Sequence, residues 1–332
     1  MNQEAIKLDA NENFFIPRNF LSNLVKEIAD EVDLRLYPSG ELYMLLMREI
    51  SSLLNVSVDS IVIGNGSDDL IALLVKILAK KGIIITNPTF RIYRWAAEVF
   101  NVKVYESMLT VNFDIDVSSI LKFNDVADLC FICSPNNPTG NQFRIDDLEE
   151  LINEFNGIVA IDEAYVDFAD YSAINLLSKY DNLIIIRTFS KGFGLASFRL
   201  GFLVASYKLA DKLRSSLPPF NVNTISVLMG VRIIKNREII EEAIKKLKIE
   251  RERLINVLST IDGVKPFNSK ANFIFFKTRI NANSIYNYLC RNNVFVRRFD
   301  NPPINNHYLR VTVGTPDMND VFIDVLRRSV SL

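Results

Sequence analysis

The first two thirds of the chain alternate short apolar runs with amphipathic helical stretches, and this alternation constrains the fold more than any other feature. Apolar runs of this length are typical of strands buried in a parallel sheet. They cover residues 61–63, 82–86, 102–106, 127–133, 157–161, 182–188 and 200–205. Helical patterns lie between them at residues 68–79, 91–100, 145–155 and 207–214. These repeated strand-helix-strand units predict an α/β fold with a doubly wound, mainly parallel sheet of seven strands.

The last third of the chain is organised differently. Pro218 and Pro219 interrupt the alternation, and a long charged helical stretch is predicted at about 227–258. Strands are then predicted at residues 273–277, 294–297 and 308–313, with helices near 283–291 and 317–328. This pattern indicates a smaller α+β domain, completed by the N-terminal segment folding back. We therefore expect a large domain at residues 35–225 and a small domain formed by residues 1–34 and 226–332.

Composition excludes several classes of protein. The 332 residues carry 38 basic and 39 acidic side chains, which leave no surplus of positive charge for a nucleic-acid backbone. No run of about 18 apolar residues is present, so we expect no membrane span. The N-terminus lacks the basic flank and apolar stretch of a signal peptide. These features predict a soluble cytoplasmic protein that binds neither nucleic acid nor membrane.

The cysteines and the single histidine offer little for catalysis or metal binding. Cys130 and Cys133 form a CxxC pattern, but they lie in an apolar run typical of a buried strand, so we interpret them as core residues. With Cys290 they make an odd count, which cannot form a complete disulfide framework. His307 lies in a turn-rich loop and is expected to be a solvated side chain. We predict no metal site, and neither GxGxxG nor a P-loop motif is present.

Polar residues gather directly after the predicted strands, where open parallel sheets bind their ligands. A small-residue turn at 64–68 leads into a helix and offers backbone N–H groups to an anion. Turn formers fill residues 134–140, and an acid and a phenol stand at 162–165. Residues 187–192 contain Ser-Lys-Gly, and Arg199 follows. An anion cradle, a carboxylate, a phenol, an amide and an amine are together what pyridoxal phosphate needs.

Several motifs resemble those of a known family. SPNNPTG at 134–140, DEAY at 162–165 and TFSKGFGLASFRLG at 188–201 resemble the motifs of fold-type I aminotransferases. KLDANEN at 7–13 and YLRVTVGT at 308–315 are similar to segments of the histidinol-phosphate aminotransferases. The resemblance covers nearly the whole chain. It implies a fold-type I pyridoxal-phosphate-dependent transferase with two domains that share the active site.

The resemblance assigns roles around the cofactor ring. It implies that Lys191 is the lysine that joins the cofactor's aldehyde and later moves a proton. Asp162 would face the pyridine nitrogen and stabilise its protonated form. Tyr165 and Asn137 would donate hydrogen bonds to the phenolic oxygen, and Phe90 would stack on the ring. Lys191, Asp162 and Tyr165 are thus the expected catalytic residues.

A second group would hold the cofactor's phosphate. The resemblance implies that Arg199 grips this dianion bidentately. It assigns the remaining contacts of the phosphate cup to Gly66, Ser67, Asp68, Thr188 and Ser190. Tyr37 resembles a tyrosine that these enzymes lend to the cofactor phosphate of the neighbouring subunit. The resemblance therefore implies a homodimer with shared active sites.

Substrate recognition is expected in the smaller domain. Arg310 resembles the arginine that binds the α-carboxylate, and Arg297 matches one that faces the substrate's side-chain phosphate. The resemblance also implies that Asn13, in the N-terminal lid, contacts the substrate. Two positions depart from the family pattern. Phe14 stands where proline is usual, and Arg91 adds a positive charge where a small residue is common.

The resemblance implies ping-pong transamination from histidinol phosphate to 2-oxoglutarate, which yields imidazole-acetol phosphate and glutamate in histidine biosynthesis. Three alternatives stay open. One is an aminotransferase for aromatic or other amino acids, and another is the O-phosphothreonine decarboxylase of cobalamin synthesis. The third is a cofactor-binding regulator without catalysis, which the retention of Lys191, Asp162 and Tyr165 disfavours.

Overall fold

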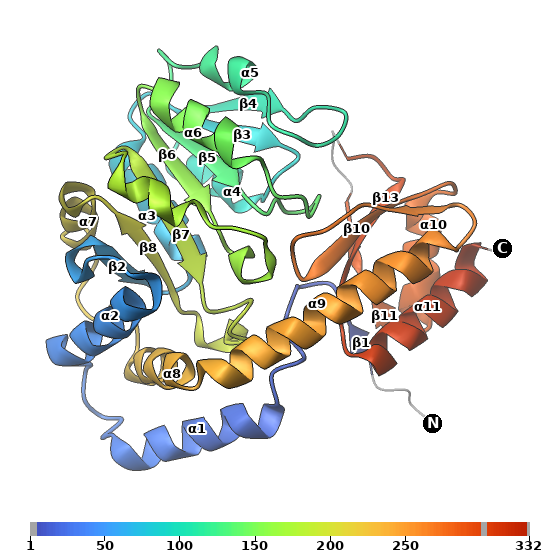
Figure 1. The fold of residues 1–332 in the computed structure, drawn as a ribbon, viewed down its shortest axis with the longest axis horizontal. Coiled ribbons are helices and arrows are strands. Elements are labelled where there is room, and N and C mark those ends of the chain that lie inside the picture. Colours follow the sequence, from blue (N-terminus) through green and yellow to red (C-terminus); the bar gives the residue numbers. More distant parts are fainter. Residues whose placement is uncertain (1–4, 300–303, 331–332) are drawn as a thin grey trace.

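The computed structural model describes residues 5–299 and 304–330 and shows two bodies, with the long helix α9 (Arg237–Ser259) running from one to the other (Figure 1). The larger body contains a seven-stranded sheet in the order β2-β8-β7-β6-β5-β3-β4. Its strands are β2 (Ile61–Gly64), β3 (Ile83–Asn87), β4 (Val104–Met108), β5 (Leu129–Cys133), β6 (Ile158–Asp162), β7 (Leu183–Thr188) and β8 (Gly201–Ala205). The seven strands and the doubly wound α/β class predicted from the sequence are confirmed.

Most neighbouring strands of this sheet run parallel. β8 is the exception, because it pairs antiparallel with both β7 and β2. The carboxyl ends of β5, β6 and β7 therefore meet at one edge, where register pairs Cys133 with Asp162 and Asp162 with Ile186. The residues that directly follow β5, β6 and β7 therefore lie close together, although they are far apart in the sequence.

Helices cover both faces of the sheet. One face packs against α3 (Ser67–Leu78), α4 (Ile92–Val99) and α7 (Tyr207–Arg214). The other face packs against α2 (Gly40–Leu54), α5 (Val117–Leu121), α6 (Ile145–Glu154) and α8 (Thr224–Lys235). Cys130 and Cys133 are both buried and lie in the cores of opposite faces, as the alternation along a strand requires. Short 3-10 turns cover Val58–Ser60, Val166–Phe168, Ala173–Ser178 and Ala196–Phe198.

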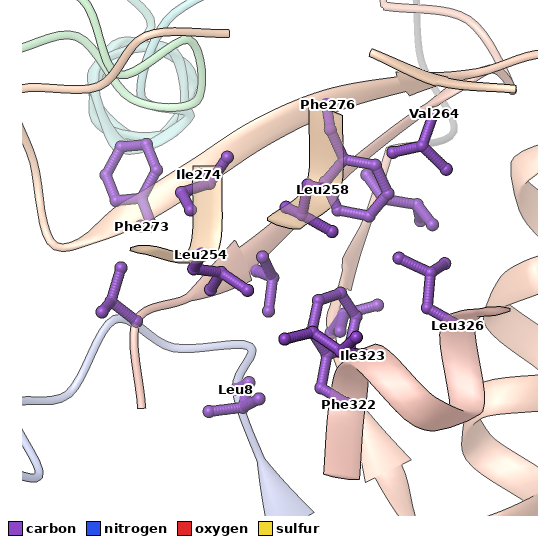
Figure 2. Close-up of a cluster of buried hydrophobic side chains, with 14 of the residues drawn as sticks. Leu8, Leu254, Leu258, Val264, Phe273, Ile274, Phe276, Phe322, Ile323 and Leu326 are labelled. Carbon is purple, nitrogen blue, oxygen red and sulfur yellow. The ribbon is translucent and has the colours of Figure 1, made fainter. Parts of the chain in front are cut away.

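The smaller body has a four-stranded sheet in the order β12-β13-β10-β9. These strands are β9 (Val264–Pro266), β10 (Phe273–Thr278), β12 (Arg297–Arg298) and β13 (Tyr308–Thr312). They pack against α9 (Arg237–Ser259), α10 (Ala282–Arg291) and α11 (Pro316–Val330), with the core shown in Figure 2. β1 (Ile6–Lys7) pairs in parallel with β11 (Val294–Phe295), so the N-terminal segment does fold back onto this body.

Two predicted elements differ in detail. The helix expected at 227–258 is two helices, α8 and α9, separated at Asn236, whose side chain donates to the carbonyl of Arg232 and ends α8. The strand expected at 294–297 is split into β11 and β12, because its two ends pair with different sheets. α1 (Arg18–Glu31) and α2 were not predicted as helices at all.

The division into domains stays a prediction. α1 buries Leu24 and Ile28 in the same cluster as α2 and α8, which also contains Phe202 of the large sheet. This packing favours placing α1 and α8 with the large body. Residues 1–4, 300–303 and 331–332 of the predicted small domain lie outside the described residues. In the described part of the chain, no helix is both long enough and apolar enough to span a membrane.

Candidate active site

A cavity of about 530 Å³ lies where the carboxyl ends of β5, β6 and β7 face the smaller body. Both bodies contribute to its walls, together with the N-terminal segment at Asp9, Ala10 and Asn11. Most of the predicted site residues line it: Ser67, Asp68, Phe90, Asn137, Asp162, Tyr165, Thr188, Ser190, Lys191, Arg199, Arg297 and Arg310. The structure thus brings together side chains that are far apart in the sequence.

Asp162 ends β6 at the floor of the cavity and is 1% exposed. Burial raises the pKa of this carboxyl to about 6, which hydrogen bonds from Tyr93 and from the backbone N–H of Ala164 oppose. The Tyr93 hydroxyl donates to Oδ2 at 2.7 Å, and the Ala164 N–H donates to Oδ1 at 3.0 Å. Each carboxylate oxygen is therefore held by one protein donor.

Tyr165 follows β6 and is the centre of an amide network. Its hydroxyl accepts hydrogen bonds from Nδ2 of Asn11 at 3.0 Å and Nδ2 of Asn137 at 3.2 Å. Burial raises the pKa of Tyr165, so the phenol keeps its proton and can donate it. Asn137 in turn accepts from Nη1 of Arg310 at 2.6 Å through its Oδ1. The network joins the sheet edge of the large body to the small body.

Lys191 lies in the loop after β7. Its Nζ donates to the carbonyl of Ala10 at 2.8 Å and lies 5.9 Å from the ring centroid of Tyr165. Burial, and then the positive charge of Arg310, lower the pKa of Lys191 to about 8. A larger fraction of this amine than of an ordinary lysine is thus neutral near physiological pH, and the neutral form is the one that attacks a carbonyl carbon.

The N-terminus of α3 and Arg199 form a cationic corner of the cavity. Gly66 precedes α3 with a φ of 90°, and a Cβ there would lie 2.9 Å from Nη2 of Arg199. Nη2 of Arg199 donates to Oδ2 of Asp68 at 2.8 Å. Ser190 lies beside it, with a buried Oγ that has no hydrogen-bond partner among the described residues. A helix N-terminus, a guanidinium and a free hydroxyl suit a phosphate.

Arginines of the smaller body line the opposite wall. Arg297 and Arg310 are directly paired across β12 and β13, so their side chains lie on the same face. Arg310 is 6% exposed, and burial lowers its pKa to about 10. Its Nη2 donates to the carbonyl of Asp9 at 2.6 Å, whereas its buried Nε has no partner in the described structure. Arg91 lines this cavity from the larger body.

Some predicted residues lie outside the lining. The Asn13 side chain donates to the carbonyl of Gly192 at 2.9 Å and so braces the loop that carries Lys191. Tyr37 is 78% exposed and stacks on Phe220, with 4.6 Å between ring centroids. Gly66 does not line the cavity, although it lies next to the guanidinium of Arg199. The roles assigned to these three residues stay predictions.

Asn11 and Tyr93 contact predicted site residues, yet sequence reasoning missed both. Asn11 lies within the KLDANEN motif, so the family resemblance was a sequence signal that could have marked it as a site residue. Tyr93 lies in the first turn of α4, three residues after Phe90, which precedes this helix. That spacing is equally typical of ordinary core packing, and the contact with Asp162 appears only in three dimensions.

The cysteines and the histidine take no part in this site beyond one contact. All three cysteines are free, and Cys133 touches the cavity wall while its Sγ donates to the carbonyl of Pro135. His307 is partly exposed, and its Nδ1 lies 3.1 Å from the carbonyl of Thr278. Across residues 5–299 and 304–330, no group of acidic, histidine and cysteine side chains is arranged to hold a metal ion.

The residues of the cavity fit pyridoxal phosphate. An amine of lowered pKa, a buried carboxylate and a phenol suit its aldehyde, ring nitrogen and phenolic oxygen. The buried Oγ of Ser190, still without a partner, would find one in the phosphate. With the fold, this cavity defines a fold-type I transferase that uses pyridoxal phosphate. A sequence model of the family described as aminotransferase class I and II matches residues 3–326, and the chain belongs to this family.

Curated relatives and a solved structure are similar to this chain over nearly its whole length. The histidinol-phosphate aminotransferase of Ruminiclostridium cellulolyticum is 34% identical over 329 residues, covering 97% of this chain and 91% of that protein. Histidinol-phosphate aminotransferase 1 of Carboxydothermus hydrogenoformans is 38% identical over 319 residues, covering 95% and 90%. The crystal structure of the histidinol-phosphate aminotransferase from Clostridium acetobutylicum aligns with a TM-score of 0.91 at 26% identity, covering 98% of this chain and 100% of that one.

Proposed function

We propose that the enzyme transfers the amino group of histidinol phosphate to 2-oxoglutarate, a step of histidine biosynthesis. One observation carries this proposal: a single cavity holds Lys191, Asp162 and Tyr165 on one side and Arg297 beside Arg310 on the other. The first set suits amine chemistry on pyridoxal phosphate, and the second suits two anionic groups of the substrates. The names of the curated relatives support the same substrate.

Lys191 is the residue that would move the reacting proton. Pyridoxal phosphate, when bound, supplies an aldehyde that accepts the substrate's amine and a ring that draws electrons from the substrate's Cα. Once the substrate's amine has displaced it, Nζ of Lys191 would take the proton from Cα, a task that its pKa of about 8 suits. In the structure, this Nζ donates a hydrogen bond to the carbonyl of Ala10 in the N-terminal segment.

Asp162 and Tyr165 would hold two other protons. Asp162 would keep a proton on the pyridine nitrogen, because a buried carboxylate strongly favours an opposite charge beside it. Tyr165 already accepts two amide hydrogen bonds, so its own O–H remains available to the phenolic oxygen. Phe90, which lines the same cavity, would cover one face of the ring.

The phosphate of the cofactor would occupy the cationic corner. The phosphate would be held by Arg199, Ser190, Thr188 and the N-terminus of α3 at Ser67. Arg199 would either give up its hydrogen bond to Asp68 or contact Asp68 and the phosphate together. The partial positive charge at a helix N-terminus stabilises such an anion without adding a side-chain charge.

Arg297 and Arg310 would divide the recognition of the two substrates. Histidinol phosphate carries a phosphate but no α-carboxylate, whereas glutamate and 2-oxoglutarate carry an α-carboxylate. Arg310, held by Asn137 and Asp9, would bind the carboxylate of the latter pair. The side chain of Arg297 is exposed and forms no hydrogen bond or ion pair with described residues, so its charge is available to the phosphate.

We also propose a homodimer with shared sites and a cytoplasmic location. Tyr37 and Phe220 are more than half exposed and stack on each other, and Leu34 and Leu36, which precede Tyr37 in the sequence, are also more than half exposed. An exposed apolar cluster of this kind supports burial against a second copy. The three unpaired cysteines support a reducing compartment.

A panel of amines tests the substrate. Purified holoenzyme receives histidinol phosphate, phenylalanine or O-phosphothreonine, each with 2-oxoglutarate, and both glutamate and carbon dioxide are measured. We expect the largest kcat/KM for glutamate formation with histidinol phosphate. A larger value with phenylalanine would indicate an aromatic aminotransferase. Carbon dioxide released from O-phosphothreonine, without glutamate from histidinol phosphate, would indicate the decarboxylase.

A further inference from the structure

We propose that Tyr93 is a positioning residue that holds the carboxylate of Asp162 and the ring of Phe90 as one unit behind the cofactor. This inference rests on the proposed cofactor chemistry of the site. It concerns a side chain that lines no part of the cavity and that acts only through its two neighbours.

The hydroxyl of Tyr93 is a donor by necessity. It lies 2.7 Å from Oδ2 of Asp162, and Tyr93 is fully buried. Burial, and then the negative charge of Asp162, raise the pKa of Tyr93 well above its usual value, so the phenol keeps its proton. An ionised carboxylate has no proton to offer, so the hydrogen bond runs from Tyr93 to Asp162.

The ring of Tyr93 cannot easily move. It stacks on Phe131 of β5 with 4.7 Å between centroids and 7° between planes. Phe90 contacts it edge to face, at 5.8 Å and 86°. Offset stacking on one side and an edge contact on the other are both favourable aromatic geometries. Phe90 and Asp162, two residues proposed to touch the cofactor ring, are thereby tied to one rigid side chain.

The charge environment gives this hydrogen bond its importance. Asp162 is buried, and the groups that face it include Cys133 on β5, Asp68 on α3 and the adjacent Glu163. Burial and the two acids raise its pKa, whereas Tyr93 and the N–H of Ala164 lower it. Removing the Tyr93 hydroxyl therefore favours protonation of Asp162, which would no longer stabilise a proton on the pyridine nitrogen.

The test compares Tyr93→Phe with wild type and with Tyr43→Phe. The control removes another phenol hydroxyl that is hydrogen-bonded, in this case to Val222, and leaves the site untouched. Full-length protein freed of cofactor is labelled with ¹³C at aspartate carboxyls, and the signal lost in Asp162→Asn identifies Asp162. We expect its titration midpoint to rise by about one pH unit in Tyr93→Phe only, as loss of a hydrogen bond to a charged group predicts. An unchanged midpoint would overturn the proposal, whether or not the enzyme transaminates histidinol phosphate.

A double-mutant cycle separates positioning from packing. The dissociation constant for pyridoxal phosphate is measured for wild type, Tyr93→Phe, Asp162→Asn and the double variant. We expect Tyr93→Phe to weaken binding about tenfold in the wild-type background, and much less when Asp162 is already replaced. In the active enzyme, kcat should fall more than KM rises. Equal weakening in both backgrounds would mean that Tyr93 only fills space, and the proposal would be wrong.

Discussion

The amine of Lys191 owes its chemistry to neighbours from three parts of the chain. Burial and the charge of Arg310 lower its pKa to about 8, while Glu12 and Asp68 oppose this shift. Because the folded-state pKa lies below the usual lysine value, the protonated form is disfavoured by folding, and the neutral form dominates above pH 8. The same network thus prepares the nucleophile before any cofactor binds.

This pKa predicts how the cofactor loads. Only neutral Nζ of Lys191 attacks the aldehyde, so the rate of covalent association of pyridoxal phosphate with cofactor-free protein should rise with pH and level off above about 8. Stopped-flow absorbance measures this rate. Lys191→Ala should show no covalent phase and no transamination. A rate independent of pH between 6 and 9 would contradict the lowered pKa.

Arg91 is predicted to contribute to recognition of the substrate phosphate. It is exposed and lines the cavity, and its side chain has no hydrogen bond or ion pair in the described part of the chain, whereas Arg94 nearby is paired with Glu106. We expect Arg91→Ser to raise KM for histidinol phosphate about fivefold, as an exposed charge contact of ~1 kcal/mol gives, without changing KM for 2-oxoglutarate. The control is Arg144→Ser, whose arginine forms an exposed pair with Asp146. Equal effects on both substrates would refute a phosphate-specific role.

Sequence reasoning worked best for residues that follow strands. Lys191, Asp162 and Arg199 were expected near one edge of the sheet, and the structure places them around one cavity. Tyr93 was missed because its helical position has the spacing of a core residue. Asn13 was expected at the substrate; its side chain donates to the carbonyl of Gly192, and its contact with the substrate stays a prediction.

At the level of elements, the close approach of β8 to α3 shapes the phosphate corner. A Cβ on Gly201 would lie 2.6 Å from the backbone nitrogen of Ser67 and 2.7 Å from the carbonyl carbon of Gly66. These are backbone atoms at the N-terminus of the helix, and they cannot move aside without moving the anion site. The glycine therefore lets the strand and the helix meet where the phosphate is proposed to bind.

This packing predicts a defect in cofactor binding. Gly201→Ala should weaken pyridoxal phosphate binding by at least tenfold and lower the melting temperature of the cofactor-free protein by several degrees, because overpacking costs about 1–3 kcal/mol. Gly40→Ala is the control, since a Cβ at this first residue of α2 meets no atom within 4 Å. Calorimetry and fluorescence titration measure both effects. Normal cofactor affinity in Gly201→Ala would contradict the proposed position of the phosphate.

The elements themselves were predictable where patterning was strong. All seven strands of the large sheet were expected, because short apolar runs between helical patterns are typical of strands in a parallel sheet. The antiparallel direction of β8 was not expected, since direction depends on a connection through Ala196–Phe198 that carries no periodicity.

Two helices of the N-terminal part were not predicted from the sequence. α1 begins after Pro17 without a side-chain cap or an acidic first turn, so the usual start signals are missing. α2 does carry a cap at Ser39, so its sequence contains a start signal.

At the scale of the whole molecule, the active site belongs to both bodies, and by proposal to two subunits. The exposed pair of Tyr37 and Phe220 lies outside the cavity of its own chain. If Tyr37 serves the partner's site, each site combines Lys191 of one subunit with Tyr37 of the other. That arrangement predicts a specific result for mixed dimers.

Co-expression of Lys191→Ala with Tyr37→Phe, under two affinity tags, tests the shared site. A mixed dimer with crossed contributions has one fully normal site and one doubly defective site. We therefore expect half of its sites to bind pyridoxal phosphate with wild-type affinity. If Tyr37 acts within its own subunit, every site keeps one defect and no wild-type affinity appears. Light scattering of the unmodified protein should give twice the 37.9 kDa chain mass.

The central claim is that this cavity transfers an amino group from histidinol phosphate to 2-oxoglutarate. The most direct measurement follows the nitrogen atom itself. Histidinol phosphate labelled with ¹⁵N at its amine is incubated with 2-oxoglutarate and holoenzyme, and glutamate is analysed by mass spectrometry. The account predicts ¹⁵N-glutamate in amounts equal to the ketone product, and none with Lys191→Ala. Label that stays in histidinol phosphate, while the holoenzyme is intact, would contradict it.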